Sequence, residues 1–450
     1  MPKTSIKKPP VYVISMGCPR NLVDSEVLTG GLKKKGFRII ATPLKNSIAI
    51  VNTCAFIEDA KAESVDVILE LADLRKKGGI KALIIAGCLS QRYKRSLMDE
   101  ISQIDGVFGS GNFTEIPQYI EKILKGGKPV IIDKRPEFLY DDRMPRTLFT
   151  PRHSVYVKIQ EGCMNFCSYC VIPGIRGPFR SRSRRSVLRE SAFLKRRGAR
   201  EINIIGQDTT LYGKDKHKKP MLAPLLKEIA ALMKSGWVRL LYTHPAHYTE
   251  SLIKVIKNEA SVCRYLDLPI QHINDKILKN MNRRVTKKDI ISLIERLRKQ
   301  IPDIAIRTSV IVGFPGEGDK EFRELVNFIK EIKFDRLGVF IYSREEGTKA
   351  FHFPHQVPEG EKEKRLKEIM EMQKTISEEN NKKYMGKTLK VLIDSESPGA
   401  ANQYLGRTQY DAPEVDGTVY VRAQKPLRLG DFVDVKINDT LEYDLAGEAK

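Results

Sequence analysis

The sequence lacks any long apolar segment. No hydrophobic run in its 450 residues approaches the roughly 18 residues that would cross a bilayer. The lysines between Met1 and Pro10 are not followed by the apolar stretch and small-residue cleavage site of a signal peptide. We therefore expect a soluble, cytoplasmic protein with no membrane partner.

Cysteine is scarce and odd in number, and we find no export signal. Both observations argue against a disulfide framework and favour a role in metal binding or redox chemistry. The seven cysteines are Cys18, Cys54, Cys88, Cys163, Cys167, Cys170 and Cys263. Acidic residues are also in short supply, with 56 Asp and Glu against 78 Lys and Arg, a formal net charge of +22. That excess indicates a polyanionic neighbour such as RNA or a ribosome, although a generally basic proteome would give the same balance.

Three cysteines lie within eight residues of one another, as Cys163-x3-Cys167-x2-Cys170, just after the strand-like run at 155–159. Thiolates this close on one loop can converge on a single soft centre, and such loops hold iron-sulfur clusters. A full ligand set has four members. This incomplete set would leave one iron open for chemistry.

Residues 11 to about 130 alternate short β-branched runs with helical patterns, which predicts a parallel sheet with crossover helices. The clearest strands, 11–15, 48–51 and 82–86, are followed by Cys18, Cys54 and Cys88. Ligands bind at the carboxyl edge of such sheets, so we expect a second site made of three thiols. Any one of them alone could be a small buried hydrophobe, as free cysteines often are, but three at the same edge favour metal. Cys263 has no such partner and is expected in the core.

Three further segments complete the predicted organisation. Residues 131–150 have mixed charge and several prolines, which is typical of a linker. Between 151 and 384, strand candidates at 155–159, 201–205, 238–242, 265–268, 304–312 and 336–342 alternate with helical patterns, which predicts a partial (β/α)6 barrel with its active site at the C-terminal face. Residues 385–450 contain short β runs that predict a small antiparallel barrel.

Polar residues follow the predicted barrel strands on what should be one face. They include Gln207, Asp208, Gln271 and His272, each of which could equally make a structural hydrogen bond. Five arginines lie between 176 and 185, where contact with an anionic cofactor or substrate and a solvated helix start are both open.

The last module differs in charge from the rest. Residues 385–450 hold eight basic and eleven acidic residues, about −3, while the remainder is about +25. An acidic barrel suits a basic protein better than a phosphate backbone.

The cysteine loop, with Tyr169 before its last thiol, resembles the radical S-adenosylmethionine signature. Together with the upstream cysteines and the terminal β module, the chain from about residue 8 resembles the methylthiotransferase family. That resemblance implies an α/β domain at 8–130 with an auxiliary cluster, a radical barrel at 151–384 and a TRAM domain at 385–450. It also implies two 4Fe-4S clusters, on Cys18, Cys54 and Cys88 and on Cys163, Cys167 and Cys170. The expected contacts to S-adenosylmethionine are Tyr169, Gln207, Asp208, Gln271, Ser309 and Gly313.

Within that family, four stretches resemble the RimO branch, which modifies an aspartate of small-subunit ribosomal protein number twelve. They are 173–177, 270–272, 342–348 and 406–417. The tRNA branch, similar to MiaB, has a proline-rich version of 342–348 and a more basic terminal domain. Met164 and Phe166 depart from the polar residues common in RimO, but neither is a ligand. A tRNA methylthiotransferase and a non-catalytic RNA-binding iron-sulfur protein are the alternatives.

The resemblance also implies the chemistry. The auxiliary cluster carries sulfur that one S-adenosylmethionine methylates, and a second is cleaved to a 5'-deoxyadenosyl radical that takes hydrogen from the aspartate β-carbon. The implied partners are the ribosomal protein, a reductant such as flavodoxin or ferredoxin, and the ribosome or its RNA.

Overall fold

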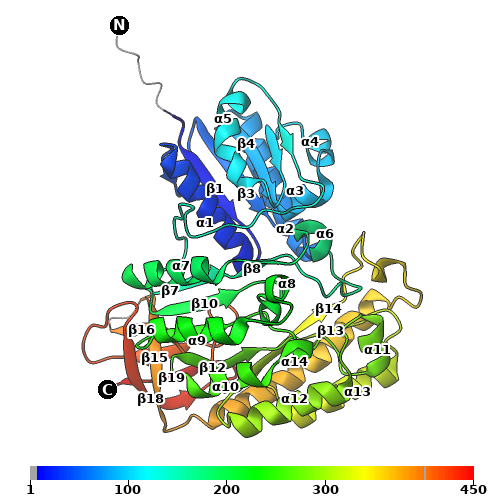
Figure 1. Ribbon diagram of the computed structural model, residues 1–450, viewed down its shortest axis with the longest axis vertical. Coiled ribbons are helices and arrows are strands. Elements are labelled where there is room, and N and C mark those ends of the chain that lie inside the picture. The colour runs from blue at the N-terminus through cyan, green and yellow to red at the C-terminus, as the bar shows by residue number, and fades with distance from the viewer. Residues whose placement is uncertain (1–7, 400–401) are drawn as a thin grey trace. The chain divides into compact units, whose positions relative to one another are not determined.

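The computed structural model describes residues 8–399 and 402–450, which form two compact units (Figure 1). The first contains 8–149, 160–166 and 170–187, and the second contains 150–159, 167–169 and the described residues from 188 onward. Within the described residues, no helix combines the length and the apolar character that crossing a membrane requires.

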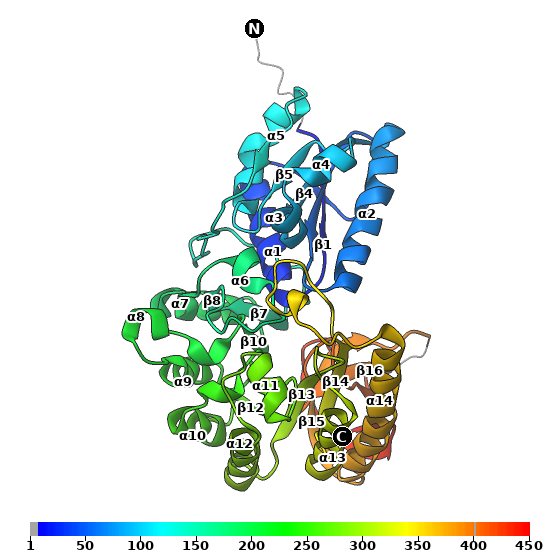
Figure 2. The same ribbon diagram turned by 90° about the vertical axis from the view of Figure 1, so that its right-hand side faces the viewer.

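The first unit is built on a six-stranded parallel sheet in the order β2-β1-β3-β4-β5-β6. Its elements are β1 (Val11–Ser15), α1 (Pro19–Lys34), β2 (Ile39–Ile40), β3 (Ser47–Thr53), α2 (Glu58–Lys76), β4 (Ile80–Gly87), α3 (Cys88–Tyr93), α4 (Ser96–Glu100), β5 (Gly106–Phe108), η1 (Phe113–Glu115), α5 (Ile116–Leu124), β6 (Val130–Ile131), β8 (Gln160–Glu161), α6 (Ile172–Arg176) and β9 (Arg180–Ser181). Figure 2 shows α2 on one side of the sheet and α1 with α5 on the other. All seven residues of β3 are buried, as expected for a central strand covered on both faces.

The segment expected to be a linker packs along α1. Residues 132–149 contain neither helix nor strand, but Arg146 Nη2 lies 2.6 Å from the buried carboxylate of Glu26. The Phe149 amide donates to the same carboxylate at 2.7 Å. At Gly30, an added Cβ would lie 2.3 Å from the Pro145 carbonyl oxygen, so only glycine allows this close approach. The segment is therefore fixed to the first unit along its length.

The second unit begins with a six-stranded parallel sheet, β14-β13-β12-β11-β10-β7, which confirms the partial barrel. Its elements are β7 (Ser154–Lys158), β10 (Glu201–Ile205), η2 (Thr209–Leu211), α8 (Lys214–His217), α9 (Leu222–Leu232), β11 (Trp237–Leu240), η3 (Pro245–His247), α10 (Glu250–Asn258), β12 (Val262–Asp267), α11 (Asp275–Asn280), α12 (Lys287–Gln300), β13 (Ala305–Val312), α13 (Asp319–Ile332), β14 (Arg336–Ile341), η4 (Ala350–His352) and α14 (Glu359–Lys382). Helix α7 (Arg184–Arg196) enters this unit at residue 188.

The terminal module is a closed five-stranded barrel, β15-β16-β17-β19-β18. The strands are β15 (Thr388–Glu396), β16 (Gln403–Thr408), β17 (Val419–Arg422), β18 (Phe432–Thr440) and β19 (Leu445–Ala449). Four of its five pairings are antiparallel, as expected, and β17 pairs with β19 in parallel. The sequence indicated neither β16 nor β19, because the glycine and polar residues of these two strands lack a β pattern. A Cβ at Gly406 would lie 2.6 Å from the Leu392 carbonyl oxygen, which explains that glycine.

Buried ion pairs attach this module to the barrel. Arg407 Nη2 lies 2.8 Å from Glu201 Oε2 on β10, and its Nε lies 2.7 Å from Asp394 Oδ2 on β15. A second pair joins Arg336 Nη2 of β14 to Asp411 Oδ1 at 2.6 Å. The 406–417 stretch, which carried part of the resemblance, therefore has a structural role at this boundary.

The residue count predicted an acidic terminal module, but the surface of the module is not strongly acidic. Asp394, Asp411 and Asp416 are engaged in ion pairs with Arg407, Arg336 and Arg307. Its exposed cations are Lys387, Lys390, Arg422, Lys425, Arg428, Lys436 and Lys450, against exposed Glu396, Glu414, Asp434, Asp439, Glu442 and Glu448. The surface is close to balanced, because part of the acidic excess is used internally.

Candidate metal centres and cofactor site

Three thiols gather at the carboxyl edge of the first sheet. Cys54 directly follows β3, Cys88 directly follows β4, and Cys18 precedes the first turn of α1, three residues after β1. These three strands are neighbours, which brings their ends together. A Cβ on Gly17, beside Cys18, would lie only 2.7 Å from Cys54 Sγ. The structure thus brings together three thiols that are about 35 residues apart in sequence, as the strand pattern predicted.

Two arginines face these thiols. Arg20 Nε lies 3.5 Å from Cys18 Sγ, and Arg176 Nη2 lies 3.3 Å from Cys88 Sγ. Burial raises the pKa of Cys18, but the charges of Arg20 and Arg176 outweigh it and bring that pKa below its ordinary value. Burial, together with the neighbouring thiol charges, raises the pKa of Cys54 to about 12. Burial also raises the pKa of Cys88, and Arg176 opposes the shift.

Arg176 is itself held rigidly. Its Nη1 donates to Asp24 Oδ2 at 2.5 Å and its Nη2 donates to Asn21 Oδ1 at 2.7 Å, and the residue is only 3% exposed. The sequence singled out its arginine run but left contact with an anion and exposure both open. At Arg176 the structure favours an anionic contact, because the guanidinium pairs with the Asp24 carboxylate and also reaches Cys88 Sγ.

The donor set fits an iron-sulfur cluster. Three soft sulfur ligands converge, and two cations lie against them to offset the charge of the thiolates. Cys263, in contrast, is buried in β12, and burial raises its pKa to about 12. It belongs to the core, as expected.

The second cysteine set lies on the loop between β8 and α6. Cys163, Cys167 and Cys170 are each partly exposed. The loop needs Gly162, because its φ is +72° and a Cβ there would lie 2.1 Å from the Pro178 carbonyl oxygen. In the second unit, Arg283 Nη1 lies 3.8 Å from Cys167 Sγ. Chain connectivity keeps the three thiols close, and Arg283 supplies a cation to one of them.

The next residue of the loop is anchored on the barrel. The Ser168 amide donates to the Met281 carbonyl oxygen at 3.0 Å, and its own carbonyl accepts from the Ala350 amide at 2.8 Å. Tyr169 packs beside the cluster that contains Phe314 and Tyr342. Cys167 is therefore presented from a fixed part of the second unit.

A polar cluster follows β10 and β11 at the C-terminal face of the barrel. Asp208 Oδ2 lies 2.9 Å from His247 Nδ1, and the His247 ring stacks on His244 with centroids 4.8 Å apart. Their ligand atoms are close enough for a metal ion. However, His244 Nδ1 accepts from the Ala246 amide at 3.2 Å, which places the proton of the neutral ring on Nε2. Burial lowers the pKa of His244 well below its usual range, so the ring stays neutral, and its Nε2 is buried without a hydrogen-bond partner among the described residues.

The remaining expected cofactor residues have structural contacts. The backbone amide of Gln271 donates to the Ser309 carbonyl oxygen at 2.9 Å, and Gln271 has a φ of +71°. Gly313 has a φ of +73°, and a Cβ there would lie 2.2 Å from Lys362 Cγ. Gln207 is partly exposed directly before Asp208. These contacts explain backbone positions, and the role of the side chains toward S-adenosylmethionine stays a prediction.

Comparison with known proteins covers all three segments. Residues 157–329 match the radical SAM superfamily, residues 10–109 match the uncharacterized protein family UPF0004, and residues 385–449 match the TRAM domain. Among solved structures, the radical S-adenosylmethionine methyltransferase TsrM from Kitasatospora setae, with cobalamin and a [4Fe-4S] cluster bound, is similar. The TM-score is 0.54 over 76% of this chain and 74% of that one, at 14% identity, which shows a shared fold.

The full-length relatives are closer. The ribosomal protein uS12 methylthiotransferase RimO of Desulfitobacterium hafniense is 46% identical over 97% of this chain and 98% of its own length. That of a Thermoanaerobacter species is 48% identical over 97% of this chain and 99% of its own length.

The fold and the thiol sets define a radical S-adenosylmethionine enzyme of the methylthiotransferase class. Its iron-sulfur and S-adenosylmethionine cofactors follow from that class. Within it, the chain belongs to the ribosomal protein uS12 methylthiotransferase RimO family. This confirms the branch expected from the sequence and matches neither the tRNA enzyme nor a non-catalytic binding protein.

Proposed function

We propose that this protein methylthiolates the β-carbon of an aspartate in ribosomal protein uS12, the small-subunit protein number twelve. The observation that carries the proposal is the convergence of Cys18, Cys54 and Cys88 at one sheet edge, in a chain that also carries the C-x3-C-x2-C loop. A radical cluster alone would cleave S-adenosylmethionine, but it would hold no sulfur to transfer. The second thiol set supplies a place for that sulfur.

Each cysteine set would hold one cluster. Cys163, Cys167 and Cys170 would leave one iron for S-adenosylmethionine, and Cys18, Cys54 and Cys88 would hold the auxiliary cluster. When bound, the clusters supply the electron that cleaves the cofactor and the sulfur that is transferred.

The chain's own residues set the charge and the position of these ligands. Arg176, fixed by Asp24 and Asn21, balances the thiolate of Cys88, and Arg20 does the same for Cys18. Such charge-assisted contacts stay in place without moving, because the arginine is buried with both of its partners.

On the second unit, the residues at the barrel mouth would position S-adenosylmethionine. The proposed contacts are Tyr169, Gln207, Asp208, Gln271, Ser309 and Gly313. Asp208 is buried and braced by the Thr210 amide at 3.1 Å and by His247, so its carboxylate is pre-oriented. A pre-oriented carboxylate suits the amino group of a cofactor.

The partners follow from the proposed reaction. A reductant protein such as flavodoxin or ferredoxin would supply electrons. With a ribosomal substrate, the enzyme would act in the cytoplasm. The near-balanced surface of the terminal module does not by itself select a basic protein, so support for uS12 comes from the full-length relatives.

The test is anaerobic reconstitution followed by incubation with uS12 and, separately, with tRNA. Mass spectrometry should find the methylthio group on the uS12 aspartate. The Cys54→Ala variant should still cleave S-adenosylmethionine but transfer no sulfur, since only the auxiliary site is lost. Cys263→Ala, a matched buried thiol away from both sets, should retain transfer. Methylthio groups on tRNA nucleosides with uS12 unchanged would overturn the proposal, as would normal transfer by Cys54→Ala.

A further inference from the structure

Cations are concentrated on one outer face of the barrel. Between residues 188 and 200 there are five basic residues and one acidic residue, Glu190, which is buried. Helix α9 lies beside α7, since Lys195 Nζ donates to the Leu232 carbonyl oxygen at 2.5 Å. The exposed cations of α7 from residue 188 onward, of α9 and of the turns that follow the two helices are Arg189, Lys195, Arg196, Arg197, Arg200, Lys227 and Lys234. We call this surface, together with Phe193, the α7–α9 face.

An aromatic ring lies within this face. Arg189, Phe193 and Arg197 are spaced at i, i+4 and i+8, which puts them on one side of the helix. Phe193 is 45% exposed, and the Arg197 guanidinium lies 5.5 Å from its ring centroid. Guanidinium groups hold phosphates, and an exposed ring is a stacking platform for a base.

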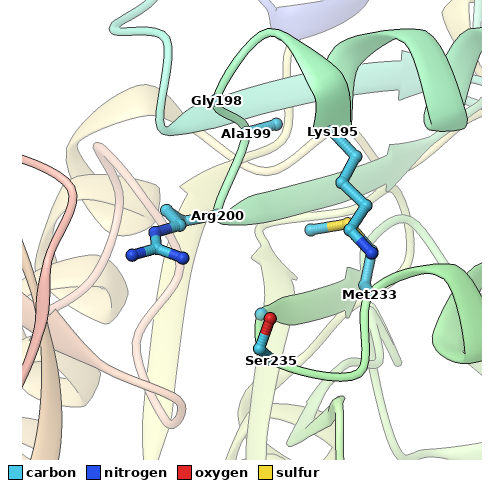
Figure 3. A pocket seen from close by; sticks show the side chains of 7 residues that line it. Lys195, Gly198, Ala199, Arg200, Met233 and Ser235 are labelled. Atoms are coloured by element: carbon cyan, nitrogen blue, oxygen red, sulfur yellow. The ribbon is translucent and has the colours of Figure 1, made fainter.

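The face also contains a hollow. A cavity of about 160 Å³ lies between the end of α7 and the turn that follows α9. Figure 3 shows Lys195, Arg200 and Ser235 around it, and no carboxylate from the described part of the chain lines it. Arg200 has only a loose ion pair with Asp431, at 3.8 Å and with both side chains nearly half exposed. The hollow thus offers cationic and hydroxyl groups to an anion.

Helix stability explains only part of this pattern. Lys195 and Arg196 lie in the last turn of α7, where cations offset the helix dipole. Arg189 lies in the middle of α7, Arg200 lies beyond its C-terminal end, and Lys234 lies in the turn after α9. The dipole of α7 therefore does not account for these three cations.

A membrane is also a poor match. A helix that binds a lipid surface inserts its apolar face. Val187 and Leu194 of α7 are buried in the protein, Phe193 is its one exposed large apolar side chain, and the exposed side is dominated by arginine. Planar guanidinium groups with an interleaved ring favour a nucleic acid strand.

We propose that the α7–α9 face binds the sugar-phosphate backbone of RNA, so that the enzyme's RNA-contacting surface lies on the barrel rather than on the TRAM module. The source of that RNA, a ribosomal assembly that contains uS12, rests on the proposed function. The binding itself does not, because it requires only the described charges and the Phe193 ring.

The first test changes charge. A variant with Arg189→Gln, Arg196→Gln, Arg197→Gln and Lys234→Gln is compared with a control that carries four matched changes on α12 and α13. The control changes are Lys288→Gln, Arg296→Gln, Lys299→Gln and Lys320→Gln, all at exposed positions. Fluorescence anisotropy measures binding of a labelled, mixed-sequence RNA of about 20 nucleotides across a salt series. Each lost phosphate contact lowers the slope of log affinity against log salt by about 0.7, so the variant should lose about 3 from the slope and at least tenfold in affinity near 0.1 M salt.

The second test separates stacking from charge. Phe193→Ser should weaken RNA binding about fivefold or more, because a base loses its platform, while the salt slope stays unchanged. A slope that falls for the four-site variant and not for Phe193→Ser would be the signature of this face.

Two controls guard the interpretation. Thermal unfolding of both four-site variants should match the parent, and both should methylthiolate free uS12 at the parental rate. Failure of the parent itself on free uS12 would contradict the proposed function and leave the RNA measurement standing. The same proteins are also tested for binding to phosphatidylserine vesicles. The RNA assignment would be overturned if the four-site variant bound RNA as tightly as the parent, or if the control lost as much RNA affinity as the variant. It would also be overturned if the variant lost binding to the vesicles and not to RNA.

Discussion

Arg407 attaches the terminal module to the barrel through a buried ion pair. It bridges Glu201 of the barrel and Asp394 of its own module, and Glu201 is fully buried. Removing one partner of a buried ion pair costs about 3–5 kcal/mol, because the other charge is left without compensation. In Arg407→Met, Glu201 would keep Arg239 at 2.9 Å and Asp394 would keep His153 at 3.1 Å. We therefore expect the lower end, a loss of about 3 kcal/mol in the free energy of unfolding.

The chain provides its own reporter for this experiment. Trp237, the single tryptophan, packs edge-on against Phe432 of β18 with ring centroids 4.7 Å apart, at the contact between barrel and module. Tryptophan emission during urea unfolding should therefore change at a lower urea concentration in Arg407→Met than in the parent. Arg422→Met, which removes an exposed cation of β17, should change stability by no more than about 0.5 kcal/mol.

A double-mutant cycle decides whether the bridge is the cause. Because the two residues share one network, Glu201→Gln combined with Arg407→Met should cost less than the sum of the single changes. A loss below about 1 kcal/mol for Arg407→Met, or strictly additive costs, would refute the reasoning.

Two further predictions concern single positions. Burial raises the pKa of Glu201, but the charges of its arginine partners outweigh it and lower the pKa to about 2, against an ordinary value of 4.5. Its contribution to stability, about 3 kcal/mol, should be complete above pH 4.5 and be lost as the pH falls toward 2, and acid titration of unfolding should show a flatter dependence in Glu201→Gln. Gly313→Ala should lower stability by about 1–3 kcal/mol in thermal unfolding, because its φ is +73° and the new Cβ would meet Lys362 Cγ at 2.2 Å. Adding Lys362→Ala should restore part of that loss, and no recovery would show that backbone conformation alone sets the cost.

The thiol site was predictable because its signal is local. Each of the three β runs ends beside a cysteine, and parallel strands share a carboxyl edge, so the pattern predicts convergence without knowledge of the packing. The contribution of Arg176 was not predictable in the same way. It reaches Cys88 from 88 residues further along the chain, and a run of five arginines does not reveal which one turns inward.

The charge of the terminal module shows a different limit. A count of residues treats every carboxylate as surface charge. Asp411 and Asp416 instead pair with Arg336 and Arg307 of the barrel strands, so they bind the module to its neighbour and are withdrawn from solvent. Sequence composition cannot distinguish a carboxylate on the surface from one in an internal ion pair, because both are the same residue type.

The same distinction locates the chain's positive charge. Several buried arginines are matched by carboxylates, as Arg176 is by Asp24 and Arg407 by Glu201, and these pairs contribute little to the field outside the protein. The excess of +22 must therefore reside mainly on exposed side chains, of which the α7–α9 face is one concentrated group. Salt screens exposed charges far more than buried pairs. Raising the salt concentration should thus weaken RNA binding by the α7–α9 face while leaving the attachment of the terminal module intact, which separates the two roles of arginine in one molecule.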